Sequence, residues 1–308
     1  MNLRDFRIGW RLLVKEPAYS AVVILGLTVG FAVCFLLLGY VRHSFSYDQN
    51  VPEVDSVYRL NQRWNTPGSM GSWTDRASLP ARDAVLAAGV PLLASPFIER
   101  KVDMKVGASV QTVSISAVDP DFQKMFKLKV LAGDIDAALT RPDALALARE
   151  TAIRLFSTAD AAGKTVQIDG QPYLVAAVVA DQPSTSTLPF ASLTGTGTRI
   201  WDEEYRKLVT TNWGSSHGPV YVKLLPGASA APVADSVKRT LLTSAFYKRM
   251  TPDQLTTMGG RDPIEFKLGP LREAYLDPEV RTNALTAPHG DRAAILGLAA
   301  VAVLILLL

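Results

Sequence analysis

Gly163-Lys164-Thr165 is the segment of this sequence closest to a known reactive motif, because a Gly-Lys-Thr run ends the phosphate-binding loop of many nucleotide-binding proteins. That loop also needs a glycine five positions before its second glycine, so that backbone N–H groups can surround a phosphate. Thr158 stands there instead. Such a loop follows a strand and opens a helix, whereas here a helical pattern precedes the run and a strand pattern follows it. We therefore interpret the run as a loop that enters a β-hairpin.

Two further groups have residue types that could act in catalysis. Ser215-Ser216-His217 pairs a hydroxyl with an imidazole, but no third member of a triad stands out, so a polar turn before a strand at Val220 is the preferred interpretation. Asp202-Glu203-Glu204 offers paired carboxylates, yet it lies beside basic residues such as Arg206, as on a solvated helix face. We expect no catalytic residue in this chain.

Metal, disulfide and nucleic-acid chemistry are also disfavoured. His43, His217 and His289 are far apart and have no Cys or His at metal-ligand spacing. Cys34 is the single cysteine and lies in an apolar run, where a thiol acts as a small hydrophobic group. The net charge is only +3, from 32 basic and 29 acidic residues. We expect no cofactor, no metal and no nucleic-acid partner.

The first structural element that the sequence predicts is an uncharged run from Ser20 to Val41. A helix of this length spans roughly 33 Å, against a hydrocarbon core of roughly 30 Å. One charged side chain there would cost about 2.5–3.5 kcal/mol on insertion scales, so its absence is informative. The sequence predicts a first transmembrane helix at residues 20–42. A cleaved signal peptide is the alternative, but its apolar region is shorter and no convincing cleavage site follows.

A second apolar run, Ala293 to Leu308, closes the sequence without a polar flank. We interpret residues 292–308 as the start of a second transmembrane helix that is truncated at the end of this sequence. Both ends of the intervening region would then be attached to the same bilayer.

Residues 1–19 predict a cytoplasmic amphipathic elbow helix on the membrane surface, ended by Pro17. Its cations recur at helical spacing on one face, and a short basic flank stays on the cytoplasmic side. These membrane-surface cations are Arg4, Arg7, Arg11 and Lys15.

Gly26 and Gly30 form a GxxxG pattern within the first apolar run. Two glycines on one face let another helix approach closely, which is how helices associate in lipid. Chance is the alternative, since glycines are common in transmembrane helices. A helix-packing role for the pair is a hypothesis.

The region between the two apolar runs mixes strand and helix patterns. Two β-α-β units are predicted at about 57–106 and 219–268, with a strand-rich insert between them, so we expect an α+β fold with helices on one side of a sheet. Asp169-Gly170 is a favoured turn pair and predicts a hairpin. Loops at 182–189 and 195–198, rich in Pro, Ser, Thr and Gly, are expected on the surface. The expected strands are 57–64, 97–106, 110–118, 144–148, 164–168, 173–179, 218–225 and 264–268, and the expected helices are 79–88, 120–126, 150–156 and 233–246.

The order of these segments resembles MacB/FtsX-like ABC transporter permeases. A basic elbow (RIGWRLLVKEPAYS) leads into a first helix with the pattern ILGL-x-x-G, followed by Ser46-Tyr47-Asp48 and a Val57-Tyr58-Arg59 strand. The segment ISAVDPDFQKMFKLKVLAGD is similar to the Asp-x-x-Phe and Leu-x-Gly-Asp pattern of the family. The stretch ETAIRLFSTADAAGKTVQIDGQPYLVAAVVADQP resembles its helix, Gly-Lys-Thr and hairpin.

The resemblance implies a periplasmic core domain at 43–291 between transmembrane helices in a bacterial inner membrane, with the N-terminus in the cytoplasm. A porter-like subdomain would comprise 57–109 and 214–285, with an inserted subdomain at 110–213. It also implies a non-enzymatic permease subunit that couples ATP hydrolysis by a separate cytoplasmic ATPase to movement of the periplasmic domain, for efflux or mechanotransmission. A second permease subunit, the bilayer and a periplasmic adaptor are the implied partners.

Two alternatives have the same topology. A transmembrane sensor of the chemoreceptor or histidine kinase type also has a helix, an ectodomain and a helix, but its second helix would continue into a cytoplasmic coiled coil. A membrane-anchored periplasmic enzyme would need a catalytic constellation, and the sequence offers none.

Overall fold

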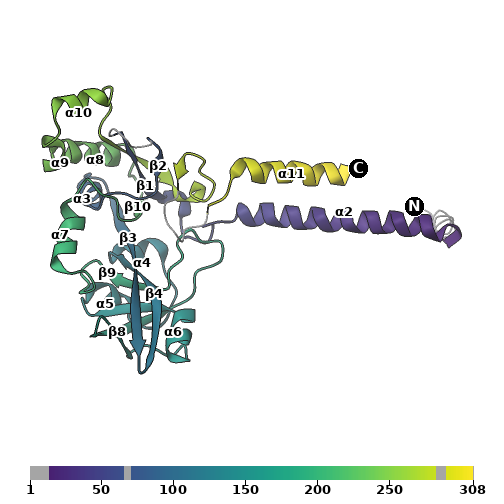
Figure 1. Ribbon diagram of the computed structural model, residues 1–308, viewed down its shortest axis with the longest axis horizontal. Coiled ribbons are helices and arrows are strands. Elements are labelled where there is room, and N and C mark those ends of the chain that lie inside the picture. Colours follow the sequence, from purple (N-terminus) through teal and green to yellow (C-terminus); the bar gives the residue numbers. More distant parts are fainter. Residues whose placement is uncertain (1–13, 66–70, 282–288, 308) are drawn as a thin grey trace. The chain divides into compact units, whose positions relative to one another are not determined.

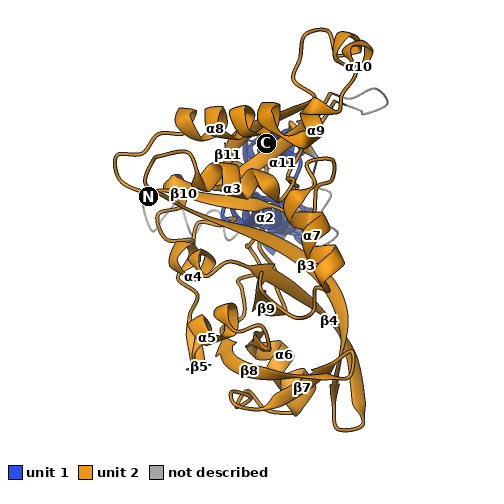
Figure 2. Ribbon diagram, turned by 90° about the vertical axis from the view of Figure 1, so that its left-hand side faces the viewer, with its two compact units in different colours: residues 1–46, 290–308 blue, residues 47–289 orange. Residues whose placement is uncertain are grey.

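The computed structural model describes residues 14–65, 71–281 and 289–307. Two compact units divide the chain: residues 1–46 with 290–308, and residues 47–289 (Figures 1 and 2). Each unit is described by itself below.

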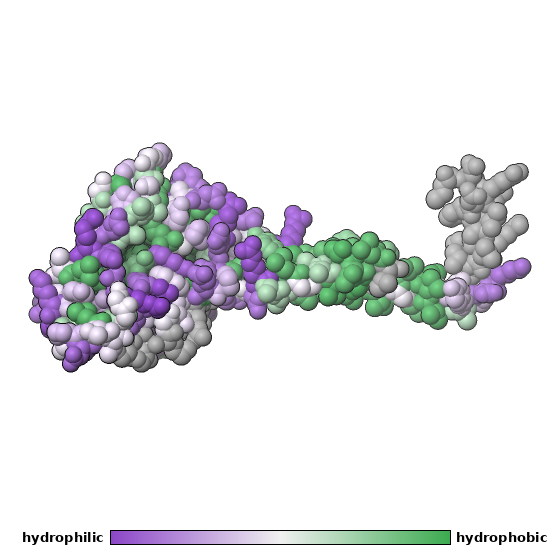
Figure 3. Space-filling model, turned by 90° about the horizontal axis from the view of Figure 1, so that it is seen from above, coloured by the Kyte–Doolittle hydropathy of each residue, from purple (hydrophilic) through white to green (hydrophobic). Residues whose placement is uncertain are grey.

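The first unit contains the two apolar helices, α2 (Pro17–Ser44) and α11 (Arg292–Leu307), which pack side by side (Figure 1). Regular helix is interrupted at Glu16, and Pro17 begins α2, as expected of a residue without a backbone N–H. Hydrophobic residues cover the visible surface of these helices (Figure 3). Among the described helices, α2 is long and apolar enough to cross a membrane, and α11 is apolar but has 16 residues.

The porter-like subdomain is built on an antiparallel sheet in which β11 (Ile264–Pro270) pairs with β1 (Val57–Trp64), β1 with β10 (Val220–Leu224), and β10 with the start of β3 (Leu92–Val106). Two helices, α3 (Pro80–Leu86) and α8 (Ala231–Thr243), connect these strands as two β-α-β units. The predicted pair of units is therefore confirmed, and the two units interleave within one sheet.

Apolar spacing explains why α3 and α8 pack on one face of this sheet. Val233, Val237 and Leu241 recur at helical intervals, are buried, and contact the sheet residues Leu60 and Val222. The hydroxyl of Ser236 on α8 donates a 2.8 Å bond to the carbonyl of Ala84 on α3.

The inserted subdomain is a sheet whose pairs close on themselves: β3 pairs with β4, β4 with β9, β9 with β6, β6 with β8, β8 with β7, and β7 with β3. Apolar side chains such as Met104, Ile115, Leu147 and Val175 form one cluster on this sheet. Its strands are β4 (Ser109–Val118), β6 (Ala144–Ala148), β7 (Thr165–Ile168), β8 (Gln171–Val179) and β9 (Ser192–Gly195), with β5 (Val130–Gly133) added beside β8.

Shorter elements complete the second unit. They are η1 (Val54–Ser56), β2 (Trp73–Thr74), α4 (Asp121–Phe126), α5 (Ile135–Thr140), α6 (Arg149–Phe156), α7 (Glu203–Thr211), α9 (Ala245–Lys248), α10 (Pro252–Thr257), η2 (Leu271–Glu273) and β12 (Val280–Arg281). Asp202 caps α7 by accepting a bond from the backbone N–H of Tyr205, so the acidic run is the solvated start of a helix, as expected.

One strand belongs to both subdomains. Residues Leu92 to Pro96 of β3 pair with β10, and residues Phe97 to Val106 pair with β4 (Figure 2). The change of partner lies at Pro96–Phe97, earlier than the division at residue 109 that the sequence predicts. An aromatic cluster covers this point, where Phe97 contacts Phe122 and Tyr221 with ring centroids 5.8 and 6.3 Å apart.

The mixed α+β prediction is confirmed, and so is the hairpin, in which β7 and β8 join through Asp169-Gly170, both with positive φ. The expectation that 182–189 and 195–198 are surface loops is wrong for part of each stretch. Thr187 and Leu188 are buried, and Gly195 lies at the end of β9. Composition favoured a loop on the surface, but contacts with distant segments bury these residues, while Pro183, Ser184 and Gly197 are exposed.

Gly195 gives a test of this packing. A Cβ at this position would overlap the carbonyl oxygen of Leu139, whereas a Cβ at Gly197 would meet nothing within 4 Å. We expect Gly195→Ala to lower the free energy of unfolding by about 1–3 kcal/mol through overpacking. Gly197→Ala is the matched control and should change it little. Denaturant unfolding followed by tryptophan fluorescence measures both, and equal stabilities of the two variants would contradict this packing.

Candidate functional site

The sequence singled out two glycines for helix packing, and one of them lies where α2 and α11 contact each other. A Cβ at Gly30 of α2 would lie 3.7 Å from Cγ2 of Ile305 of α11, while a Cβ at Gly26 would meet nothing within 4 Å among the described residues. The thiol of Cys34 approaches the carbonyl oxygen of Ala302 at 3.4 Å. Gly30 therefore faces α11, and Gly26, one turn earlier on the same face of α2, has no described residue against it.

The predicted membrane-surface cations are only partly covered by the structure. Lys15 is exposed, and Arg4, Arg7 and Arg11 lie outside the described residues. The Gly-Lys-Thr run occupies the loop between α6 and β7, where Gly163 has a positive φ of 82° and donates a 2.8 Å bond to the carbonyl of Val175. The run enters a hairpin, as the sequence analysis concluded.

The two ends of the second unit meet at a set of contacts that we call the junction: Tyr47, Asp48, Asp55, Thr187, Arg272 and Tyr275. The rings of Tyr47 and Tyr275 stack with centroids 3.6 Å apart and planes 3° apart. Arg272 of η2 forms an ion pair with Asp55 of η1 at 2.6 Å. Tyr47 follows α2 in the sequence and Tyr275 precedes α11, so the segments leading to both apolar helices are joined here.

Asp48 is the buried centre of the junction. It is fully buried, and its two carboxylate oxygens accept bonds from the backbone N–H of Thr187 at 2.8 Å and from the Thr187 hydroxyl at 2.6 Å. Its own N–H donates to the carbonyl of Thr185 at 2.8 Å. A φ of 56° at Asp48 suits Asp and Asn better than most residues. The start of the second unit is thereby bonded to the inserted subdomain through one side chain.

Burial has the largest effect on the pKa of the Asp48 carboxyl. Desolvation raises the pKa of Asp48 above its ordinary value, although the two bonds from Thr187 and the nearby guanidinium of Arg59 act in the opposite direction. Arg59 is itself buried and pairs with the buried Asp75 at 3.5 Å. Burial also raises the pKa of Tyr221 far above that of a free phenol.

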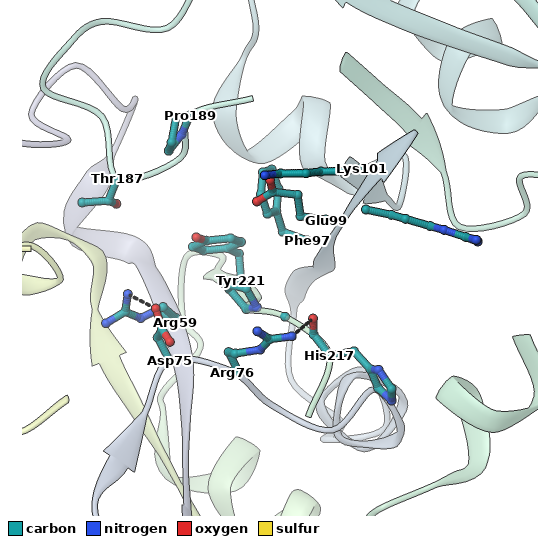
Figure 4. Close-up of a pocket in the computed structure, with 13 residues that line it drawn as sticks. Arg59, Asp75, Arg76, Phe97, Glu99, Lys101, Thr187, Pro189, His217 and Tyr221 are labelled. Carbon is teal, nitrogen blue, oxygen red and sulfur yellow. Dashed lines mark hydrogen bonds and ion pairs between the residues drawn. The ribbon is translucent and has the colours of Figure 1, made fainter. Parts of the chain in front are cut away.

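A cavity of about 280 Å³ lies beside this polar group, where the two subdomains meet. Tyr221 stands at its centre, with the Arg59–Asp75 pair and Arg76 on one side and Lys101 on the other (Figure 4). Thr187 contributes to its wall as well as to the junction.

The histidine motif also borders this cavity. The Ser215 hydroxyl lies 2.9 Å from Nε2 of His217, and the His217 carbonyl accepts a 2.8 Å bond from Arg76. Burial, with a contribution from Arg76, lowers the pKa of His217, so its ring is neutral at neutral pH. This is a polar turn that leads into β10, as the sequence predicts.

Sequence reasoning missed most of these residues. Asp48 and Arg59 appear in the family-like segments, but nothing local marks Thr187, Arg76 or Tyr275 as their neighbours. Thr187 follows Asp48 by 139 positions, and a Ser/Thr-rich stretch gives no signal of burial.

Comparison with solved structures gives similar folds. A domain assigned to a permease protein from Porphyromonas gingivalis is 20% identical, with a TM-score of 0.55 over 72% of this chain and 92% of that chain. The periplasmic region of MacB from Actinobacillus actinomycetemcomitans is 14% identical, with a TM-score of 0.44 over 73% and 92%. The extracellular domain of the ABC-type transporter YknZ from Gram-positive bacteria is 14% identical, with a TM-score of 0.41 over 68% and 98%.

Comparison with curated proteins gives no significant match. At the level of families, the description "MacB-like periplasmic core domain" matches residues 20–240, which is well over half of the chain. The match includes α2 from Ser20 onward, the junction residue Asp48, the first β-α-β unit and the second one as far as α8. This chain therefore belongs to the MacB-like periplasmic core domain family of ABC transporter permeases.

Proposed function

We propose that this chain is a non-enzymatic permease subunit of an ABC transporter in a bacterial inner membrane. A separate cytoplasmic ATPase hydrolyses ATP, and the apolar helices transmit the resulting movement to the periplasmic domain. The outcome is export of a substrate or mechanical control of a partner. Family membership and one helix able to cross a membrane support this proposal.

The main structural support for this proposal is the junction. Its contacts join the segment after α2 to the segment before α11, through the Tyr47–Tyr275 stack and the Arg272–Asp55 pair. The buried Asp48–Thr187 bonds continue the connection into the inserted subdomain. A relative movement of the two helices must therefore reorient the domain or break these contacts.

The implied assembly follows from the same argument. An ATPase subunit supplies energy, a second permease subunit completes a pair, and the position of Gly26, which no described residue contacts, is our candidate for that contact. The bilayer surrounds the apolar helices, Arg4, Arg7, Arg11 and Lys15 lie at its cytoplasmic surface, and a periplasmic adaptor is a further candidate partner.

Substitutions of Asp48 test the junction. Asp48→Ala removes both acceptors and leaves the buried N–H of Thr187 without a partner, so we expect a loss of about 1–3 kcal/mol in the free energy of unfolding. Asp48→Asn keeps an acceptor and the tolerance for positive φ, and serves as the matched control with a smaller loss. Thermal and denaturant unfolding of the detergent-solubilised chain measure both.

The pH dependence of that comparison has a definite sign. Because the pKa of Asp48 is raised in the folded state above the ordinary 3.8, its carboxyl contributes most to stability below that pH, and the contribution is lost as the pH rises through the folded-state pKa. The stability of the wild type relative to Asp48→Asn should therefore fall between acidic and neutral pH. A difference that grows with pH would contradict a desolvated carboxylate.

Affinity purification from detergent-solubilised native membranes tests the function itself. The tagged chain should recover a nucleotide-binding subunit, and Asp48→Ala should recover the same subunit because the substitution lies outside the cytoplasm. Recovery of a kinase or chemotaxis adaptor without a nucleotide-binding subunit would overturn the permease proposal in favour of a transmembrane sensor.

A further inference from the structure

The cavity beside the junction has walls from both subdomains. Arg59 and Tyr221 come from strands of the porter-like sheet, Lys101 comes from the part of β3 that pairs with β4, and Thr187 comes from the buried loop of the inserted subdomain. Figure 4 shows these side chains around one space, with Tyr221 between them. At about 280 Å³ it is near the lower limit of the volumes usual for small-ligand sites.

The lining carries an excess of positive charge. Four cationic side chains, Arg59, Arg76, Arg100 and Lys101, face two carboxylates, Asp75 and Glu99. Asp75 pairs with Arg59, and Glu99 accepts a bond from the hydroxyl of Ser114. Within the described part of the chain, Arg76, Arg100 and Lys101 have no carboxylate partner.

Arg76 is held in place at one end of its guanidinium. One terminal nitrogen donates a 2.8 Å bond to the carbonyl of His217, and no carboxylate among the described residues pairs with the group. The positive charge of Arg76 in the cavity wall is therefore not neutralised by a neighbouring acid. Burial and the nearby Arg76 lower the pKa of His217, so its neutral ring adds no further positive charge to the wall.

The remaining wall is aromatic and apolar. Tyr221 and Phe97 meet edge to face with centroids 6.3 Å apart, and Pro189 lies across the space from them (Figure 4). The apolar part of a small ligand would lie beside this wall and lose contact with water, while an attached anionic group would be attracted by the cations.

We propose that this cavity binds a small organic anion, with its apolar part beside Tyr221 and Phe97 and its negative group attracted by the excess positive charge of the wall, to which Arg76 and Lys101 contribute. The site is separate from any ATPase contact and goes beyond the permease role. Because Thr187 belongs both to the cavity wall and to the junction, occupancy of the site and the position of the junction are thermodynamically linked.

Calorimetric titration of the full chain in lipid nanodiscs with benzoate tests this proposal. Benzamide is a neutral analogue of the same shape, and benzylamine is its cationic counterpart. We expect saturable one-to-one binding of benzoate that weakens as salt is raised, with at least tenfold weaker binding of both analogues. No saturable binding of benzoate, or equal binding of benzamide, would overturn the proposal.

Three variants localise the site. Arg76→Gln and Lys101→Gln should each weaken benzoate binding about tenfold, whereas Arg239→Gln, on the exposed face of α8, should leave it unchanged. Lys101 is exposed and makes no ion pair among the described residues, so its substitution leaves folding intact even if Arg76→Gln does not. Wild-type affinity in Lys101→Gln would overturn the assignment. The titration needs no ATPase, so its failure leaves the permease proposal standing.

Discussion

A buried carboxylate organises the junction of this domain. Asp48 is fully buried and bonded twice to Thr187, yet its raised pKa shows that desolvation outweighs those bonds and the attraction of Arg59. At neutral pH the charge therefore costs stability relative to its protonated form. What the arrangement provides is a fixed, directional connection between the segment after α2 and the inserted subdomain.

One strand joins the two subdomains. Because β3 belongs to both sheets, changing partner at Pro96–Phe97, the two subdomains share one continuous strand rather than a loop. Within the inserted subdomain the pairs of β3, β4, β9, β6, β8 and β7 close on themselves. The aromatic cluster, the cavity and Thr187 all lie where the subdomains meet.

Sequence patterns correctly predicted the elements whose structure depends on neighbouring residues in the chain. The uncharged run around α2, the apolar spacing of α8 and the Asp169-Gly170 turn each specify their own structure, and the structure confirms them. The short β9 and the burial of Thr187 depend on partners far away in the sequence, so composition pointed to a surface loop. Local patterns could not predict the cavity for the same reason, since Arg76 and His217 are 141 positions apart in the sequence and meet only in the folded domain.

Spin labels on the two subdomains test the coupling most directly. In a Cys34→Ser background, one label replaces the exposed Val110 at the tip of the β3–β4 hairpin and another replaces Arg239 on α8. Distances measured by pulsed electron resonance, with the ATPase bound, should shift between the nucleotide-free and vanadate-trapped states, and Asp48→Ala should abolish the shift. The same distance distribution in both states of the wild type would contradict transmission of movement through this junction.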